Sequence, residues 1–169
     1  MIQAPQQPGL LYAVAALKGV APGARPPRAA QSAAADALLR KLRADAAEGA
    51  SSKAHARGMA AAAFAPQGCV GVDLDYRQPG RDIGAIAAWL LDARAPDEAS
   101  AYRVFTYREA YFKALGEWPS APLLREVAGA EAGEFRTRDG LNVRCEPVGE
   151  AFVLTLVWSA SGPARRLAP

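Results

Sequence analysis

Two aspartates stand one residue apart within an apolar run, "VGVDLDY", at residues 70–76. Side chains of a strand alternate between its faces, so Asp73 and Asp75 point one way and the apolar side chains of the run point the other way. Two carboxylates this close repel each other, and their removal from water increases that cost. We therefore expect a positive charge between them.

A third carboxylate follows farther along the chain, in a segment with the composition of a helix. Glu109 and Lys113 are four residues apart and share one face of that helix. Alone they would be a surface pair worth about 0.3–0.5 kcal/mol. With the two aspartates, they make a hard oxygen site suited to Mg²⁺, an ion that shares its coordination shell with substrate phosphates. The sequence therefore predicts Asp73, Asp75 and Glu109 as metal ligands, and Lys113 as a cation directed at phosphate oxygens.

The elements that position these residues are read from hydrophobic periodicity. Asp82 and Asp97 are suited to begin two helices, and Gly116 is suited to end the second of them. Residues 48–58 break the helical pattern before them, and "PQG" at 66–68 predicts a hairpin between the strands on either side. We expect strands at residues 10–17, 59–65, 69–76, 133–139, 141–148 and 151–159, and helices over 29–50, 81–95 and 96–119.

The order of these elements indicates an α+β protein. A strand, a helix and a hairpin are followed by two helices and three strands, so we interpret the chain as a pseudo-dimer of two similar halves, each a small antiparallel sheet with packed helices. The N-terminal half is predicted at residues 1–68 and the C-terminal half, which carries the metal-site motifs, at 69–160. Residues 161–169 are expected to form a flexible tail.

Composition and charge exclude several classes of protein. The net charge of +3 comes without a dense basic tract, so we expect no nucleic-acid partner. No apolar run approaches the roughly 20 residues that span a bilayer, and no Lys or Arg precedes the first apolar stretch, so neither a membrane span nor a signal peptide is predicted. Cys69 and Cys145 lie far apart, which favours free thiols in a reducing cytoplasm.

The motifs together resemble the signature of the 4′-phosphopantetheinyl transferases. That signature is a strand G-[VI]-D-[VIL]-[ED] followed by a helix W-[ST]-x-K-E-A-x-x-K-x-x-G, and this chain has "GVDLDY" at 71–76 and "FTYREAYFKALG" at 105–116. Upstream, "SSKAHARG" is similar to the family's S-x-S-H segment and puts His55 on the motif histidine. The match covers about residues 52–117. Phe105 stands where the family has Trp, and Arg108 where it has Lys.

The resemblance implies a holo-[acyl-carrier-protein] synthase type of transferase. Such an enzyme moves the phosphopantetheine arm of coenzyme A to a serine of an acyl or peptidyl carrier protein and releases 3′,5′-ADP. By position, Asp73, Asp75 and Glu109 would hold Mg²⁺ against the diphosphate, and Glu109 would also be the catalytic base. Lys113 would bind the diphosphate and offset its growing charge, and His55 would contact the 3′-phosphate of coenzyme A.

The position of the motif within the chain separates two types of this family. Residues 1–70 precede "GVDLDY", which resembles the larger, surfactin-synthetase-activating type in a short variant, and we expect a monomer. Two alternatives stay open. One is a non-catalytic homologue that binds coenzyme A or a carrier protein, and the other is an unrelated Mg²⁺-dependent enzyme with a nucleoside diphosphate substrate. Arg77 and Arg81 are expected to be plain surface residues, and the alternative is contact with acidic groups of a carrier protein or of the nucleotide.

Overall fold

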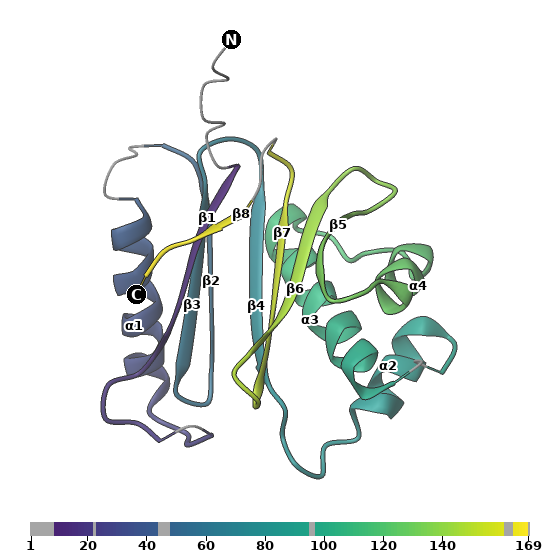
Figure 1. The fold of residues 1–169 in the computed structure, drawn as a ribbon, viewed down its shortest axis with the longest axis horizontal. Coiled ribbons are helices and arrows are strands. Elements are labelled where there is room, and N and C mark those ends of the chain that lie inside the picture. The colour runs from purple at the N-terminus through teal and green to yellow at the C-terminus, as the bar shows by residue number, and fades with distance from the viewer. Residues whose placement is uncertain (1–8, 22, 44–47, 95–96, 161–163, 169) are drawn as a thin grey trace.

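Two four-stranded sheets pack face to face between layers of helices in the computed structural model (Figure 1). It describes residues 9–21, 23–43, 48–94, 97–160 and 164–168. The first sheet consists of β1 (Leu10–Ala16), β2 (Ala50–Ala56), β3 (Met59–Ala65) and β8 (Ala164–Arg166). The second sheet consists of β4 (Val70–Tyr76), β5 (Gly133–Arg136), β6 (Asn142–Val148) and β7 (Phe152–Trp158). The helices are α1 (Arg28–Leu42), α2 (Ile83–Leu91), α3 (Glu98–Leu115) and α4 (Ala121–Gly129).

The two sheets share a three-stranded unit, and the fourth strand is added at opposite edges of that unit. The first has the order β2-β3-β1-β8 and the second the order β4-β7-β6-β5. In each, a hairpin (β2-β3 or β6-β7) lies beside an antiparallel strand that comes before it in the chain (β1 or β4). At least one helix connects that first strand to the hairpin in both cases. The predicted α+β class is confirmed, and the internal repeat is visible as topology.

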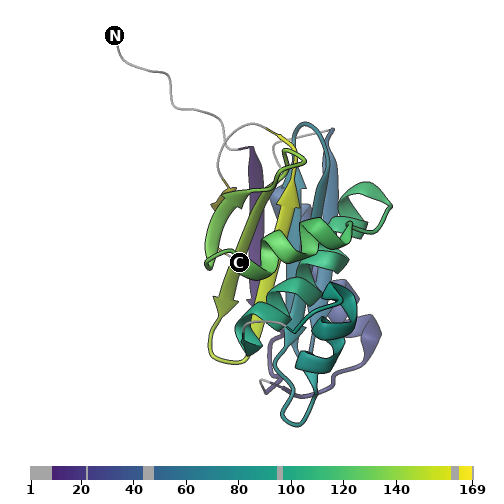
Figure 2. The same ribbon diagram turned by 90° about the vertical axis from the view of Figure 1, so that its right-hand side faces the viewer.

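Three apolar clusters hold the layers together. The central one lies between the sheets and contains large side chains such as Tyr12, Leu154 and Trp158. A second cluster joins α1 to the first sheet through residues such as Leu38 and Phe64. The third joins α2, α3 and α4 to the second sheet, and these helices lie in front of that sheet in the side view (Figure 2). The central strands β3 and β7 are therefore buried on both faces.

The predicted capping residues of α2 and α3 are confirmed, whereas the helix predicted over 29–50 is too long, because α1 ends at Leu42. Asp82 accepts a hydrogen bond from the backbone N–H of Ala85 (2.9 Å) at the start of α2, and Asp97 accepts one from Ser100 (2.6 Å) at the start of α3. Gly116 ends α3 in the left-handed conformation, with φ of 77°, which only glycine adopts without strain. Pro96 lies outside the described residues. The helix α4 was not predicted.

The predicted hairpin at residues 66–68 is wrong. The strand before it, β3, pairs with β1 and β2, whereas β4 after it pairs with β7 in the other sheet. The hairpin of the first sheet is instead β2-β3, which turns at Arg57 and Gly58 with positive φ at both residues (44° and 82°). Turn residues mark a change of direction, but they do not decide which strands pair across it.

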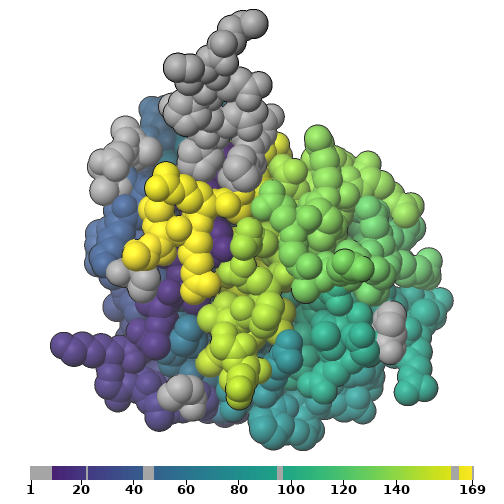
Figure 3. Space-filling model, viewed as in Figure 1, coloured from purple at the N-terminus to yellow at the C-terminus, as the bar shows by residue number. Residues whose placement is uncertain are grey.

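The C-terminal segment differs from the expected flexible tail. Ala164–Arg166 forms β8, which pairs in parallel with β1 at the edge of the first sheet. The space-filling view shows this segment, in yellow, on the surface over the purple β1 (Figure 3). The last strand thus returns to the first half of the chain. Across the described residues no helix has the length and apolarity needed to cross a membrane.

The two free thiols differ in accessibility, which predicts different reactivity. Cys69 is half-buried, whereas Cys145 is buried beside the Thr155 hydroxyl (3.3 Å), and burial raises the pKa of Cys145 to about 11. Since the thiolate is the reactive form, we expect Ellman's reagent to modify one thiol rapidly in the native protein and both in guanidinium. The Cys69→Ser variant should show no rapid phase. Two rapid thiols in the native protein would contradict this placement.

Candidate functional site

The helix α3 lies across β4 and faces the two aspartates of that strand. Val70, Val72 and Leu74 belong to the cluster between the sheets, so the alternate residues Gly71, Asp73 and Asp75 face α3. A Cβ atom built on Gly71 would overlap the backbone oxygen of Ala110 and lie 2.8 Å from the backbone nitrogen of Ala114. The missing side chain therefore allows α3 to approach the strand closely, next to the residues that carry the candidate chemistry.

Lys113 supplies the positive charge beside Asp73. Its Nζ lies 2.8 Å from Asp73 Oδ1 and donates a second hydrogen bond to the Val72 carbonyl (2.9 Å). The Asp73 side chain is only 14% exposed. Burial raises the pKa of Asp73, Lys113 opposes that shift, and Asp75 and Glu109 add to it. Asp75 and Glu109 are thus both close enough to Asp73 to repel its charge.

Asp75 is held by one donor from the loop that follows its strand and by one from the strand itself. Arg81 Nη1 lies 2.6 Å from Asp75 Oδ2, and the backbone N–H of Tyr76 donates to Oδ1 (2.9 Å). The guanidinium of Arg81 also lies 4.5 Å from the ring centroid of Phe105 on α3. The expectation that Arg81 is a plain surface residue is therefore wrong, because it joins the strand acid to the helix.

Glu109 is the most exposed of the three acids, at 31%. Its Oε1 lies 2.7 Å from Nη1 of Arg108. The Arg108 guanidinium in turn lies 3.6 Å from the ring centroid of Trp118, which stacks on Phe112 at a centroid distance of 4.2 Å. Glu109 is consequently bordered by a cation on one side and by an exposed aromatic pair beyond it.

His55 lies on β2, in an open pocket of about 450 Å³ between the two halves. The first half contributes His55 together with Arg25, Arg28 and Arg57, and the second contributes Asp75, Tyr76 and Arg81. Burial, followed by the charge of Arg28, lowers the pKa of His55, and Lys113 acts in the same direction. The pocket is therefore basic, and it borders the carboxylate site through Asp75.

Three basic residues of this pocket were not predicted. Arg25 comes from the Pro/Gly-rich segment before α1, Arg28 is the first residue of α1, and Arg57 forms part of the β2-β3 turn. Arg57 is fixed by a hydrogen bond to the side chain of Gln78 (2.5 Å), which crosses from one half to the other. The sequence shows these arginines only as charges near predicted loops and turns, and this does not indicate which part of the fold they line.

The three acids match the chemistry of a Mg²⁺ site but not its finished geometry. They offer carboxylate oxygens from one strand and one facing helix, which is the donor type that Mg²⁺ takes. Each carboxylate is instead paired with a cation: Lys113, Arg81 or Arg108. Within the described ranges no group of three or more acidic, His or Cys side chains forms a ready metal cage. A divalent cation would have to share or replace these contacts.

A scan of the chain against models of protein families and a search among curated proteins each found no match.

Proposed function

We propose that the protein is a monomeric cytoplasmic 4′-phosphopantetheinyl transferase that modifies a serine of an acyl or peptidyl carrier protein with coenzyme A as donor. The observation that carries the proposal is that Asp75 and Glu109 lie close enough to Asp73 to raise its pKa, that Asp73 pairs with Lys113, and that a basic pocket between the two halves borders Asp75. Coenzyme A carries a diphosphate and a separate 3′-phosphate, so it requires both parts of such a site. The repeated β-α-β-β topology also supports the pseudo-dimer fold that the family resemblance implies.

The carboxylates of the site offer the donor type that a Mg²⁺ ion holding the diphosphate would need. Asp73, Asp75 and Glu109 would be its ligands, and when bound the ion would neutralise charge on the phosphate oxygens. Asp73 is fixed in place by Lys113, and Asp75 by the backbone N–H of Tyr76. The cation would share or replace the contacts with Lys113 and Arg81, while the Tyr76 N–H would keep Asp75 oriented for phosphoryl transfer, a reaction that depends on positioning.

The chain's own residues supply the proton transfer and the charge compensation. The serine oxygen of the carrier attacks the phosphorus that bears the pantetheine arm, the bond from that phosphorus to the bridging oxygen breaks, and 3′,5′-ADP leaves. Glu109 would take the serine proton, since it is the most exposed of the three acids. Lys113 would stabilise the charge that develops on the diphosphate.

The basic pocket would hold the nucleotide end of coenzyme A. Arg25 and Arg28 carry charge that suits a 3′-phosphate, and His55 lies on the same pocket wall. At neutral pH the lowered pKa of His55 favours its uncharged form, so in the absence of a bound phosphate it would contribute a hydrogen bond rather than a charge. The site of group transfer and the nucleotide site would then meet at Asp75.

Every candidate metal ligand is paired with an Arg or Lys, and this observation favours a second function, binding without catalysis. A homologue that binds coenzyme A or a carrier without turnover would have no need to release those pairs. The same combination of acids and basic pocket would also suit an enzyme that acts on another nucleoside diphosphate.

The deciding experiment is incubation with coenzyme A, Mg²⁺ and a panel of apo acyl and peptidyl carrier proteins, followed by intact-mass measurement. We expect one carrier to gain the mass of a single phosphopantetheine, and chelation of Mg²⁺ to prevent this. Binding of coenzyme A without any mass shift would support the non-catalytic homologue. Binding of a sugar nucleotide in the absence of coenzyme A binding would exclude the proposed transferase.

A further inference from the structure

We propose that Arg81 is a diphosphate-binding residue, which exchanges its contact with Asp75 for the phosphate oxygens of the ligand. This inference rests on the proposed function. It also adds a residue to the site, since neither the sequence motifs nor the proposed mechanism assigns a role to Arg81.

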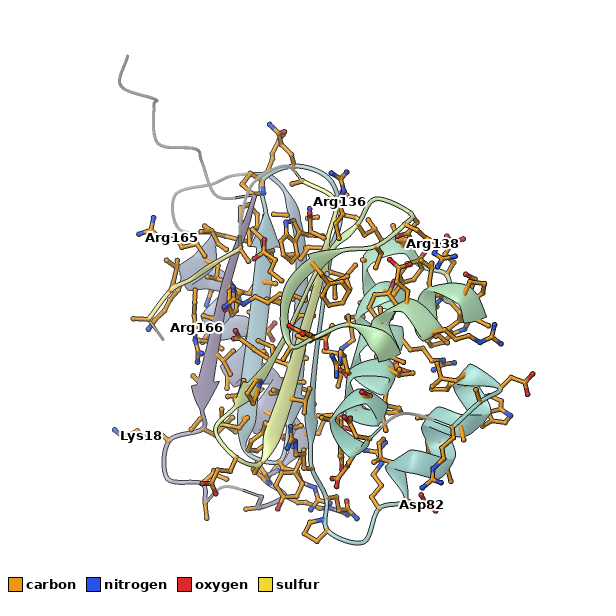
Figure 4. All side chains as sticks on the ribbon, turned by 45° about the vertical axis from the view of Figure 1, so that its right-hand side comes forward. Lys18, Asp82, Arg136, Arg138, Arg165 and Arg166 are labelled. Carbon is orange, nitrogen blue, oxygen red and sulfur yellow. The ribbon has the colours of Figure 1, made fainter. Side chains whose placement is uncertain are left out.

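Arg81 lies where the carboxylate site and the open pockets meet. Its side chain is 24% exposed and contributes to the wall of the basic pocket that contains His55. It also borders a second open pocket, of about 590 Å³, formed by the beginnings of α2 and α3. Figure 4 shows the next residue, Asp82, at the end of the molecule where the chain enters α2. A ligand that extends from the basic pocket towards Asp75 would therefore pass Arg81.

The backbone around Arg81 holds it at this position. Its N–H donates to the Gln78 carbonyl (3.1 Å), and its own carbonyl accepts from Ile83 (2.9 Å) at the start of α2. The guanidinium contacts the face of Phe105 at 4.5 Å from the ring centroid, which orients a planar cation. Its position is therefore fixed by the loop and the ring as well as by Asp75.

The contact between Arg81 and Asp75 leaves both partners free to exchange. One nitrogen of the guanidinium, Nη1, contacts one oxygen of Asp75, and an arginine carries five donors in a fork that matches phosphate. The other oxygen of Asp75 keeps its bond from the Tyr76 N–H. Loss of the Arg81 contact would leave Asp75 oriented, and a diphosphate would offer the released guanidinium more negative charge than one carboxylate.

This exchange predicts effects of opposite sign on metal and on diphosphate. Without a phosphate ligand, Arg81 competes with a divalent cation for the charge of Asp75. With a diphosphate present, Arg81 binds the same ligand as the cation does. The Arg81→Gln variant should therefore bind Mn²⁺ alone about threefold more tightly, and Mg²⁺–pyrophosphate about tenfold more weakly, than the unchanged protein does.

The experiment measures free Mn²⁺ by electron paramagnetic resonance and Mg²⁺–pyrophosphate binding by calorimetry, with no turnover required. Arg77→Gln is the matched control, because Arg77 lies on the same loop and its guanidinium lies 6.0 Å from the ring centroid of Tyr102, outside both pockets. It should change neither affinity. Arg81→Lys, which keeps the charge but loses the fork, should bind pyrophosphate with intermediate affinity.

Coenzyme A is titrated in parallel to separate the two proposals. Unchanged pyrophosphate affinity in Arg81→Gln, or weaker binding of both Mn²⁺ and pyrophosphate, would overturn the role of Arg81 even if coenzyme A binds. Opposite shifts in the two affinities, without any binding of coenzyme A, would support the role of Arg81 and remove the proposed transferase. If the unchanged protein binds neither pyrophosphate nor coenzyme A, both proposals fail.

Discussion

The Asp73→Asn variant is expected to lose phosphopantetheine transfer by about 10³-fold. Asp73 is the least exposed of the three candidate metal ligands and the one in contact with Lys113. Asn preserves the shape of the side chain but removes the charge that would hold both the lysine and a divalent cation. The rate is measured with saturating coenzyme A and carrier protein, over a range of Mg²⁺ concentrations.

The fold of this variant should survive the substitution. Burial raises the pKa of Asp73, so the folded protein binds a proton there more tightly than the unfolded chain does. The charged form therefore costs folding free energy once the pH rises above the ordinary carboxyl pKa, and removal of the charge should not lower the free energy of unfolding at neutral pH without metal. Urea denaturation checks this.

Asp36→Asn provides the matched control. Asp36 also pairs with a lysine, Lys53, at 2.6 Å, but the pair is exposed and joins α1 to β2. It should keep full transfer activity, because a surface pair of this kind contributes little. Equal activity of the Asp73 and Asp36 variants would contradict the assignment of Asp73 to the site.

The acids of the site could be predicted because each lies on a face of a strand or helix that the local residue spacing determines. Strand alternation predicted that Asp73 and Asp75 share a face, and that face is turned to α3. The helical spacing placed Glu109 and Lys113 together, and Lys113 does reach Asp73. The partners of the other two acids could not be predicted, because Arg81 reaches Asp75 only through the fold of its loop.

The fold was predictable where a single residue type decides the local conformation. Asp97 and Gly116 bound α3 as expected, because a side-chain cap and a positive φ are local properties. Strand pairing is not local, and the strand β2 carries mostly small residues in place of the branched ones that mark strands. Every second residue of β2 is buried at Ser52 and Ala54, but the sequence does not show what covers them. In the structure Ser52 faces β4, where its Oγ accepts a hydrogen bond from the Val72 N–H (3.0 Å).

The Gly71→Ala variant is expected to lose about 3 kcal/mol of unfolding free energy or more. The added Cβ would meet backbone atoms of α3, at Ala110 and Ala114, rather than a flexible side chain that could move aside. Relief of the overlap requires α3 to move away from β4. Urea denaturation followed by the fluorescence of the tryptophans, of which Trp158 is fully buried, measures the change.

Gly84→Ala makes the same chemical change, but it is expected to raise the free energy of unfolding rather than lower it. Gly84 lies in α2, and its nearest neighbour to a built Cβ is Asp82 Oδ1 at 3.5 Å, an ordinary contact. Alanine should therefore stabilise the helix by about 0.5–1 kcal/mol.

The Gly71 prediction fails if the free energy of unfolding of Gly71→Ala lies within about 1 kcal/mol of that of the unchanged protein. Such a result would show that α3 is not held against β4. Because Ala110 adjoins Glu109, the folded fraction of Gly71→Ala should also transfer more slowly, as the helix acid and Lys113 move away from Asp73.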